Sequence, residues 1–200
     1  MIRSRAQLTL LAALMGVAAV IAYASSQGGS QRRESHIDGP ITGLGPGGFS
    51  RNENVGTRFT DGQLVLRNNS GKELKLVEVK PVISGDGLTF LGAQVAGHDR
   101  EIGITQYIPR FPPRRKELGR VTQVRGAVLP PEPNDPSMGY EVLLGYEVTG
   151  PRRSTVPAVR VTYSDGDRTW TEEVIATVAV CTPAAREEDC PMEYGKAGSP

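Results

Sequence analysis

The chain has 200 residues, with 23 Lys and Arg against 22 Asp and Glu and a formal net charge of +1. This balance excludes a protein that gathers nucleic acid through its overall charge. Hydrophobic residues make up 38% and aromatic residues 6%, and 24 Gly and 15 Pro suit short strands and turns better than long helices. We therefore expect an all-β protein, large enough to fold without a cofactor.

An apolar segment opens the sequence. Arg3 and Arg5 precede an uncharged run at 6–24. Its length falls between the roughly 7–15 residues of a signal-peptide core and the about 20 residues of a spanning helix. Two alternatives stay open: an uncleaved single-pass anchor, and a signal peptide cleaved near Ala24 after the small-x-small sequence Ala22-Tyr23-Ala24. The basic residues favour a cytoplasmic N-terminus in both cases, which predicts that the rest of the chain is extracytoplasmic.

The stretch 25–56 is rich in Gly, Ser and charge and holds few apolar side chains. This composition predicts a flexible tether, followed by one domain at 57–200. As an alternative, the part around Ile41, Leu44 and Phe49 docks on the domain as an added strand.

Period-two alternation marks the strands of the domain. Apolar and other residues alternate over 140–148, which predicts a strand with one apolar and one mixed face. Strands at 159–163 and 170–180 flank Ser164-Asp165-Gly166-Asp167, an Asp-Gly turn that predicts a tight hairpin.

Further strands are expected on the N-terminal side of these. Segments 63–67 and 72–79 flank the turn-forming residues 68–71, which predicts a second hairpin, and the alternation slips between Leu76 and Val77, which predicts a bulge. Three more strands are expected at 88–95, 102–108 and 121–129.

The total is about seven or eight short strands, at spacings typical of an antiparallel β-sandwich. The pattern over roughly 57–180 resembles the immunoglobulin-like β-sandwich domains that bacterial cell-envelope proteins use as binding or spacer modules. The sequence departs from antibody domains because both cysteines follow Trp170. A small β-barrel fits the same strand pattern and stays open as an alternative.

Cys181 and Cys190 are the only cysteines, and they fall in the part predicted to be exported, where thiols oxidise. We expect a disulfide between them that holds the C-terminal tail after the last strand, with a contribution of roughly 2–3 kcal/mol. A redox-active pair is the alternative, but the spacing is not C-x-x-C.

Catalytic and metal-binding patterns are scarce. The chain has two histidines, His36 and His98, too few for a histidine-based zinc or copper site. It contains no Gly-x-Ser-x-Gly motif, so nucleophilic catalysis would need loops assembled around His98. We expect no metal, no cofactor and no enzymatic activity, with a hydrolase as a remaining alternative.

Two loops concentrate arginine. Arg110, Arg114, Arg115 and Lys116 surround the sequence Phe111-Pro112-Pro113, and Arg152-Arg153 follow Gly150-Pro151. Guanidinium groups bind phosphates and carboxylates as a fork, so these loops are candidate contacts for an anionic envelope polymer or a lipid headgroup. The alternative is that they are ordinary charged loops.

These features together predict a non-catalytic extracytoplasmic domain, tethered to the membrane or secreted, that binds or spaces something at the cell envelope. The second hypothesis is a subunit or assembly partner of an envelope complex, which would use an exposed strand edge or the Pro-rich loop for contact.

Overall fold

The computed structural model of the chain describes residues 39–43, 47–97, 105–131 and 139–182. The chain forms two units, 1–35 and 36–200, and every described residue belongs to the second. The predicted anchor or signal peptide therefore lies outside the described residues. Among the residues that are described, no helix is long and apolar enough to cross a bilayer.

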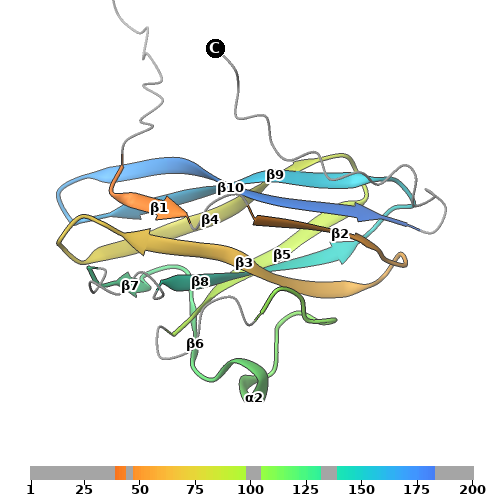
Figure 1. Cartoon of the computed structure of the whole chain (residues 1–200), viewed down its shortest axis with the longest axis horizontal. Coiled ribbons are helices and arrows are strands. Elements are labelled where there is room, and N and C mark those ends of the chain that lie inside the picture. The colour runs from red at the N-terminus through yellow and green to blue at the C-terminus, as the bar shows by residue number, and fades with distance from the viewer. Residues whose placement is uncertain (1–38, 44–46, 98–104, 132–138, 183–200) are drawn as a thin grey trace, which may run out of the picture. The chain divides into compact units, whose positions relative to one another are not determined.

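The described residues form ten strands and one short helix, and they confirm the all-β prediction (Figure 1). The elements are β1 (Ile41–Gly43), β2 (Gly47–Asn52), β3 (Arg58–Asn68), β4 (Leu74–Ser84), β5 (Leu88–Ala96), α2 (Arg115–Leu118), β6 (Val121–Gln123), β7 (Val128–Leu129), β8 (Tyr140–Val148), β9 (Ser154–Ser164) and β10 (Thr169–Cys181).

The strands form two five-stranded sheets. The first sheet has the order β1-β3-β8-β5-β6, and the second has the order β2-β10-β9-β4-β7. All pairs are antiparallel except β2, which runs parallel to β10. The strand count exceeds the expected seven or eight because β1 and β2 form within the stretch predicted to be the tether, and because β6 and β7 divide the single strand predicted at 121–129. The strand predicted at 102–108 is wrong over its described part, 105–108, which makes a single bridge from Ile108 to Thr60.

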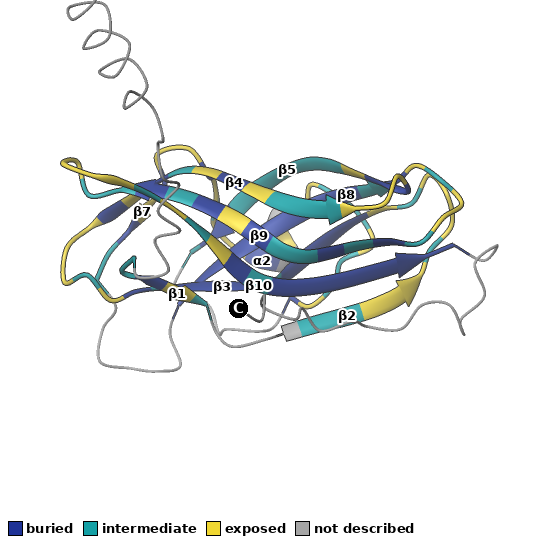
Figure 2. Ribbon diagram, turned by 90° about the horizontal axis from the view of Figure 1, so that it is seen from above, coloured by how far each residue is buried: buried dark blue, intermediate teal, exposed yellow. Residues whose placement is uncertain are grey.

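One hydrophobic core joins the facing surfaces of the two sheets. Phe59 and Tyr146 from the first sheet and Tyr163 from the second are fully buried in it. Trp170 covers the core beside Tyr163, with the two rings stacked 5.5 Å apart. Figure 2 shows how burial follows the strands: β10 is buried along its C-terminal half, while exposed residues recur along β4.

The predicted hairpin at 159–180 is confirmed, since β9 and β10 pair from Ser164 and Thr169 onward. Its turn is longer than the tight turn that we predicted. Asp165 Oδ1 accepts hydrogen bonds from the backbone amides of Asp167 and Arg168, at 3.0 and 2.9 Å, and within the turn positive φ is confined to Gly166.

The second predicted hairpin is wrong, because β3 and β4 belong to different sheets. The turn between them carries the chain from one sheet to the other. The buried side chain of Asn68 stabilises this crossing: its Nδ2 donates to the carbonyls of Lys72 and Leu129, both at 2.7 Å, and its Oδ1 accepts from the amide of Ser70 at 3.0 Å. The bulge expected at Leu76 and Val77 is confirmed by a register shift between Leu76 and Glu78.

The first two strands form within the stretch 25–56, which its composition predicted to be a flexible tether. β1 pairs with β3 in the first sheet, and β2, only three residues further on, pairs with β10 in the second. This agrees with the alternative in which the segment around Ile41 and Phe49 docks on the domain. Both sheets therefore receive an edge strand from the N-terminal segment, on the same side of the domain.

The opposite side of the domain has two partly open strand edges. Beyond its first residues, β4 pairs with no described strand other than β9, and Pro81 lies in this edge without a backbone N–H to donate. The open part of β5 is interrupted by a register shift between Phe90 and Gly92, where Gly92 has a φ of 137°. Both irregularities disrupt the row of groups that another strand would need for pairing.

Candidate functional site

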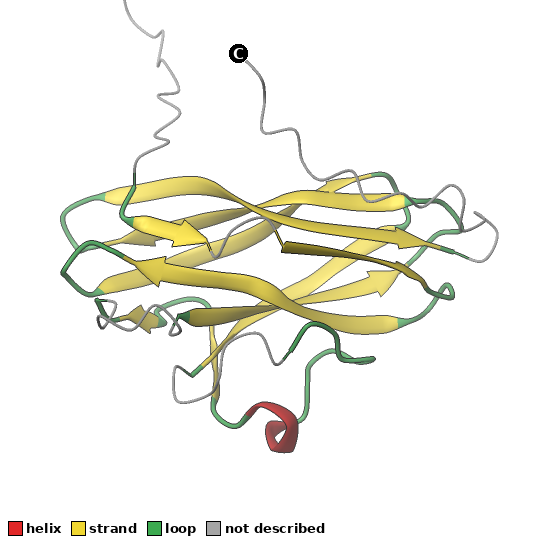
Figure 3. Cartoon of the chain, in the orientation of Figure 1, coloured by secondary structure: helices red, strands yellow, loops and turns green. Residues whose placement is uncertain are grey.

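Residues 105–123, which we call the strap, cross the outer face of the first sheet. The strap starts at the free edge of β3, where the backbones of Thr60 and Ile108 exchange two hydrogen bonds of 2.8 and 3.0 Å. It ends as β6, which pairs with β5 on the far side of the same sheet. Figure 3 shows α2, within the strap, lying off the two sheets.

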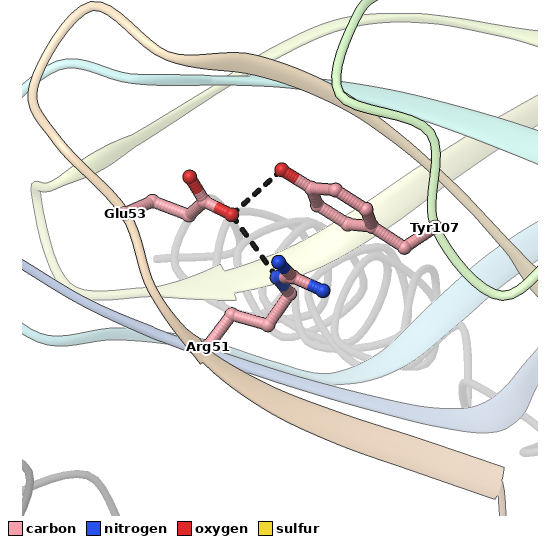
Figure 4. Close-up of polar contacts among 3 residues, drawn as sticks. All are labelled: Arg51, Glu53 and Tyr107. Atoms are coloured by element: carbon pink, nitrogen blue, oxygen red, sulfur yellow. Dashed lines mark hydrogen bonds and ion pairs between the residues drawn. The ribbon is translucent and has the colours of Figure 1, made fainter.

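A polar clamp fixes the start of the strap to the end of β2 (Figure 4). The Tyr107 hydroxyl donates to Glu53 Oε1 at 2.6 Å, and Arg51 Nε donates to the same oxygen at 3.1 Å. The Arg51 guanidinium also lies 3.8 Å from the centre of the Tyr107 ring, in a cation–π contact. Burial and the hydrogen bond to Glu53 raise the pKa of Tyr107 to about 12, so the phenol stays a donor at neutral pH.

The middle of the strap is held by Phe111, whose ring lies over Gly145 of β8. A Cβ atom at Gly145 would come within 2.3 Å of the ring, and one at Gly92 of β5 would lie 3.8 Å from it. Position 145 therefore has to be glycine for the ring to rest on the sheet backbone.

The C-terminal part of the strap rests on apolar side chains. Leu118 packs with Leu143 of β8 and Ala96 of β5, and Ile108 and Val121 extend this small cluster. The face of β8 that we predicted to be mixed is therefore covered as well, with Glu141 3% exposed and Leu143 fully buried. These contacts hold the strap as a defined part of the domain.

Positive charge is concentrated on the strap and the turn that follows it. Residues 110–125 contain six basic residues and one acidic residue, whereas the other described residues contain ten basic and eleven acidic ones. The charge of this region is thus a local feature, which the overall balance of the chain conceals.

Half of the ten basic side chains in the other described residues are paired with acidic neighbours. Five of them form ion pairs of 2.7–3.5 Å: Arg51 with Glu53, Arg58 with Glu147, Lys80 with Glu78, Arg152 with Asp86, and Arg160 with Glu173. Lys116, Arg120 and Arg125 are exposed and make no ion pair with any described residue, and the same holds for Lys72, Lys75 and Arg168. Lys116, Arg120 and Arg125 differ from the latter three in lying within the basic stretch 110–125, and they can receive an external anion without giving up an ion pair to a described residue.

The strap contains three of the five arginines expected to contact an anion. Arg110 is half-buried at its start, where its carbonyl accepts a hydrogen bond of 2.5 Å from the Thr60 hydroxyl. Arg114 is exposed, and Arg115 is the first residue of α2.

The other two arginines, Arg152 and Arg153, lie elsewhere, in the loop between β8 and β9. Arg152 pairs with Asp86 at the turn between β4 and β5. Gly87 lies beside this turn and Gly92 lies under Phe111, and the two glycines are roughly 17 Å apart along the chain that forms β5. The structure thus separates the five arginines into two groups instead of one contact surface.

Arg120 and Arg125 were missed as contact candidates in the sequence. They flank β6, one just before and one within the segment 121–129 that was predicted to be a strand. Their charges were therefore not counted together with those of the arginines around the Pro-rich sequence Phe111-Pro112-Pro113. A count of charge over 110–125 would have included them.

A buried polar group lies under the strap and inside the core. Asp61, at a bulge in β3, is fully buried; its Oδ1 accepts the amide of Gln63 at 2.9 Å, and its Oδ2 has no hydrogen-bond partner among the described residues. Burial, with a smaller effect of Glu141, raises its pKa to about 7, although the Gln63 amide lowers it. Burial also raises the pKa of Tyr146 nearby. Since neither Asp61 nor Tyr146 reaches the surface, the group affects stability rather than ligand contact.

Several predicted residues lie outside the described part of the chain. Cys181 ends β10 and is fully buried, but Cys190 is not described, so the disulfide stays a prediction. The same holds for His36 and His98, and with them for the hydrolase alternative. Among described residues, no three His, Cys, Asp or Glu side chains gather in a way that could hold a metal ion.

Comparison with known proteins gives no family. No family model matches the chain, and no curated protein matches it. Among solved structures, the chain is similar to the secreted serine protease VesC from Vibrio cholerae, with 12% identity and a TM-score of 0.31. The similarity covers 66% of this chain and 21% of that one, so this chain spans about a fifth of the protease. A similarity at this level carries no conclusion about the activity of this chain.

Proposed function

We propose that this chain is a non-catalytic extracytoplasmic module of the cell envelope that binds an anionic ligand through the strap and the turn that follows it. The observation that carries the proposal is a set of exposed cations without an ion pair to any described residue, Lys116 and Arg120 on the strap and Arg125 in the turn after it, beside a segment fixed to the sheet at several points. A fixed segment presents its charges without a large ordering cost on binding.

The strand order supports an immunoglobulin-like sandwich as the scaffold. In chain order, β1, β3, β4, β5, β8, β9 and β10 occupy the places of strands A to G, with A, B, E and D in one sheet and C, F and G in the other. β2, β6 and β7 are additions to this arrangement. Such sandwiches commonly serve as binding or spacer modules that bind ligands through their connecting segments, which agrees with the strap as the ligand-facing part.

A charge-reversal variant tests the binding function. We expect Lys116→Glu, Arg120→Glu and Arg125→Glu together to release a chain that lacks the apolar segment 1–24 from isolated envelope material at low salt, by at least about tenfold in affinity. Co-sedimentation with washed envelope fractions measures this.

The matched control carries the same charge change at Lys72→Glu in the turn before β4, Lys75→Glu at the start of β4 and Arg168→Glu in the turn before β10, and is expected to sediment like the wild type. Equal retention of both triple variants would contradict binding through the strap and favour a spacer.

Export is tested by the intact mass of the native protein. We expect a protein recovered from the cell envelope, either at full length or lacking the residues up to about Ala24, and lighter by two protons because Cys181 and Cys190 are joined. Mass spectrometry with and without reduction measures both features. A full-length chain in the cytosol with two free thiols would contradict the extracytoplasmic assignment.

A further inference from the structure

The outward face of β10 changes from exposed to fully buried along the strand (Figure 2). Residues with odd numbers on β10 face away from the core, because their even-numbered neighbours pack in it. Thr171 and Glu173, near the start of the strand, are exposed to solvent. Thr177, Ala179 and Cys181, near its end, have exposed fractions of 1%, 0% and 0%. The C-terminal half of this face is therefore covered.

The neighbouring strands do not account for this burial. Ala179 lies between Ser50 of β2 and Thr155 of β9, of which Ser50 is exposed and Thr155 half-buried. Both side chains are short, so they cannot close over the residue between them. Ala179 and Cys181 form an apolar cluster separate from the main core, to which no other described residue belongs.

The cover also excludes water from the strand. The Thr177 hydroxyl is buried, and it has no hydrogen-bond partner among the described residues. On an open sheet face water would hydrate such a group, and keeping it dry costs free energy. A segment packed directly on β10 accounts for this.

The chain leaves the last strand at the buried end of this face. Cys181 is the last residue of β10, and the Thr182 hydroxyl donates to the carbonyl of Pro151 at 2.8 Å. The predicted disulfide would bring the Cα atom of Cys190 to within roughly 4.4–6.8 Å of that of Cys181, on the outward side. From there, about four residues of extended chain reach back over the roughly 13 Å to Thr177.

The sequence after Cys190 suits a segment that lies on a sheet. Met192 and Tyr194 alternate with Glu193 and Gly195. This is the period-two pattern of an extended chain with one apolar and one polar side. With the apolar side turned to β10, the Glu193 carboxylate would face solvent.

We infer that residues 191–200 turn back over the outer face of the second sheet and cover Thr177 and Ala179 with Met192 and Tyr194. The end of the chain is then an added layer of the domain. The inference does not depend on anion binding by the strap. It also means that a partner of this part of the sheet would first have to displace the chain's own C-terminal segment.

Hydroxyl-radical footprinting of the full, oxidised chain tests the inference, and a free peptide of residues 183–200 at the same radical dose is the exposed reference. Because oxidation follows exposure, we expect Met192 and Tyr194 to be oxidised at least about fivefold more slowly in the chain than in the peptide. Equal rates would overturn the inference, since another segment or a partner would then cover β10.

Ala179→Arg tests the place of contact. A charged side chain is costly to bury under an apolar segment, so we expect Met192 to be oxidised at least about threefold faster in this variant than in the wild type. The matched control Thr171→Arg changes an exposed position on the same face and should leave the rate unchanged. Tyr163 in the core should stay protected in both variants. Protection of Met192 that Ala179→Arg does not relieve would place the segment elsewhere and overturn the inference.

Tyr194→Ala gives a readout that does not require the Ala179→Arg variant to fold. Loss of the packed ring is expected to lower the urea midpoint of the full chain by roughly 0.5–1 M. Glu193→Ala removes a side chain from the opposite side of the segment and should leave the midpoint unchanged. A Tyr194→Ala midpoint equal to that of the wild type would contradict the contact with the sheet.

Discussion

Asp61→Asn is expected to remove a pH dependence from the stability of the domain. The Asp61 carboxyl is buried, one of its oxygens lacks a hydrogen-bond donor among the described residues, and its pKa is raised from 3.8 to about 7. The charged form is therefore disfavoured in the folded chain, where Glu141 and Tyr146 interact electrostatically with Asp61 and the Gln63 amide is the one donor to it among the described residues. The asparagine variant cannot ionise and should not respond to pH at this site.

The direction follows from proton binding. Because the pKa is higher in the folded chain than in the unfolded chain, the folded state holds more protons between pH 3.8 and about 7. The contribution of Asp61 to stability is complete below pH 3.8 and is lost as the pH rises to about 7, by about 4 kcal/mol in total.

Urea unfolding of the wild type and the variant at several pH values measures this effect, since the other carboxyl groups cancel in the difference. The advantage of the variant over the wild type should grow between pH 4 and pH 7.5. A constant difference would show that Asp61 titrates normally.

Gly145→Ala is expected to lift the strap from the first sheet. The added methyl group would lie 2.3 Å from ring atoms of Phe111, so either the ring or the backbone of β8 has to move. Overpacking of this kind costs about 1–3 kcal/mol. The Phe111 ring lies on the outer side of the sheet, so we expect the strap to move rather than β8. Urea unfolding would measure the loss of stability, and hydrogen exchange over 105–123 would measure the displacement of the strap.

A double-variant cycle with Phe111→Ala isolates this contact. Without the ring, the three atoms closest to the methyl group at position 145 are gone, so the combined loss of stability should be smaller than the sum of the two single losses. Additive losses would mean that the ring does not rest on Gly145. The control Gly119→Ala changes a strap glycine with open space around it, and its cost arises from its positive φ of 69° instead of a collision.

Strands with regular alternation could be predicted from the sequence, and sheet membership could not. Residues 140–148 have the period-two pattern, and the predicted bounds agree with β8. The turn at 68–71 is rich in residues that favour any reversal of the chain, so it predicted a hairpin although the strands on either side enter different sheets. Only the long-range contact of Asn68 with the carbonyl of Leu129 distinguishes these outcomes, and local sequence does not contain it.

The candidate site was predicted in part, because charge can be read from the sequence and pairing cannot. Arg110, Arg114 and Arg115 were found as a basic stretch, and the structure places them on the strap. Arg152 looked equivalent, but its ion pair with Asp86 depends on two loops that are far apart in the sequence. The covered face of β8 was also unpredictable, since Gly145 gives no hint that an aromatic ring from another segment lies on it.

The irregular edges of β4 and β5 have a consequence for encounters between copies of this domain. A straight open edge would let neighbouring copies pair strand to strand into continuous ribbons. Pro81 withholds a donor from one edge and the turn of backbone at Gly92 bends the other, so neither edge offers a second copy a regular row of groups to pair with.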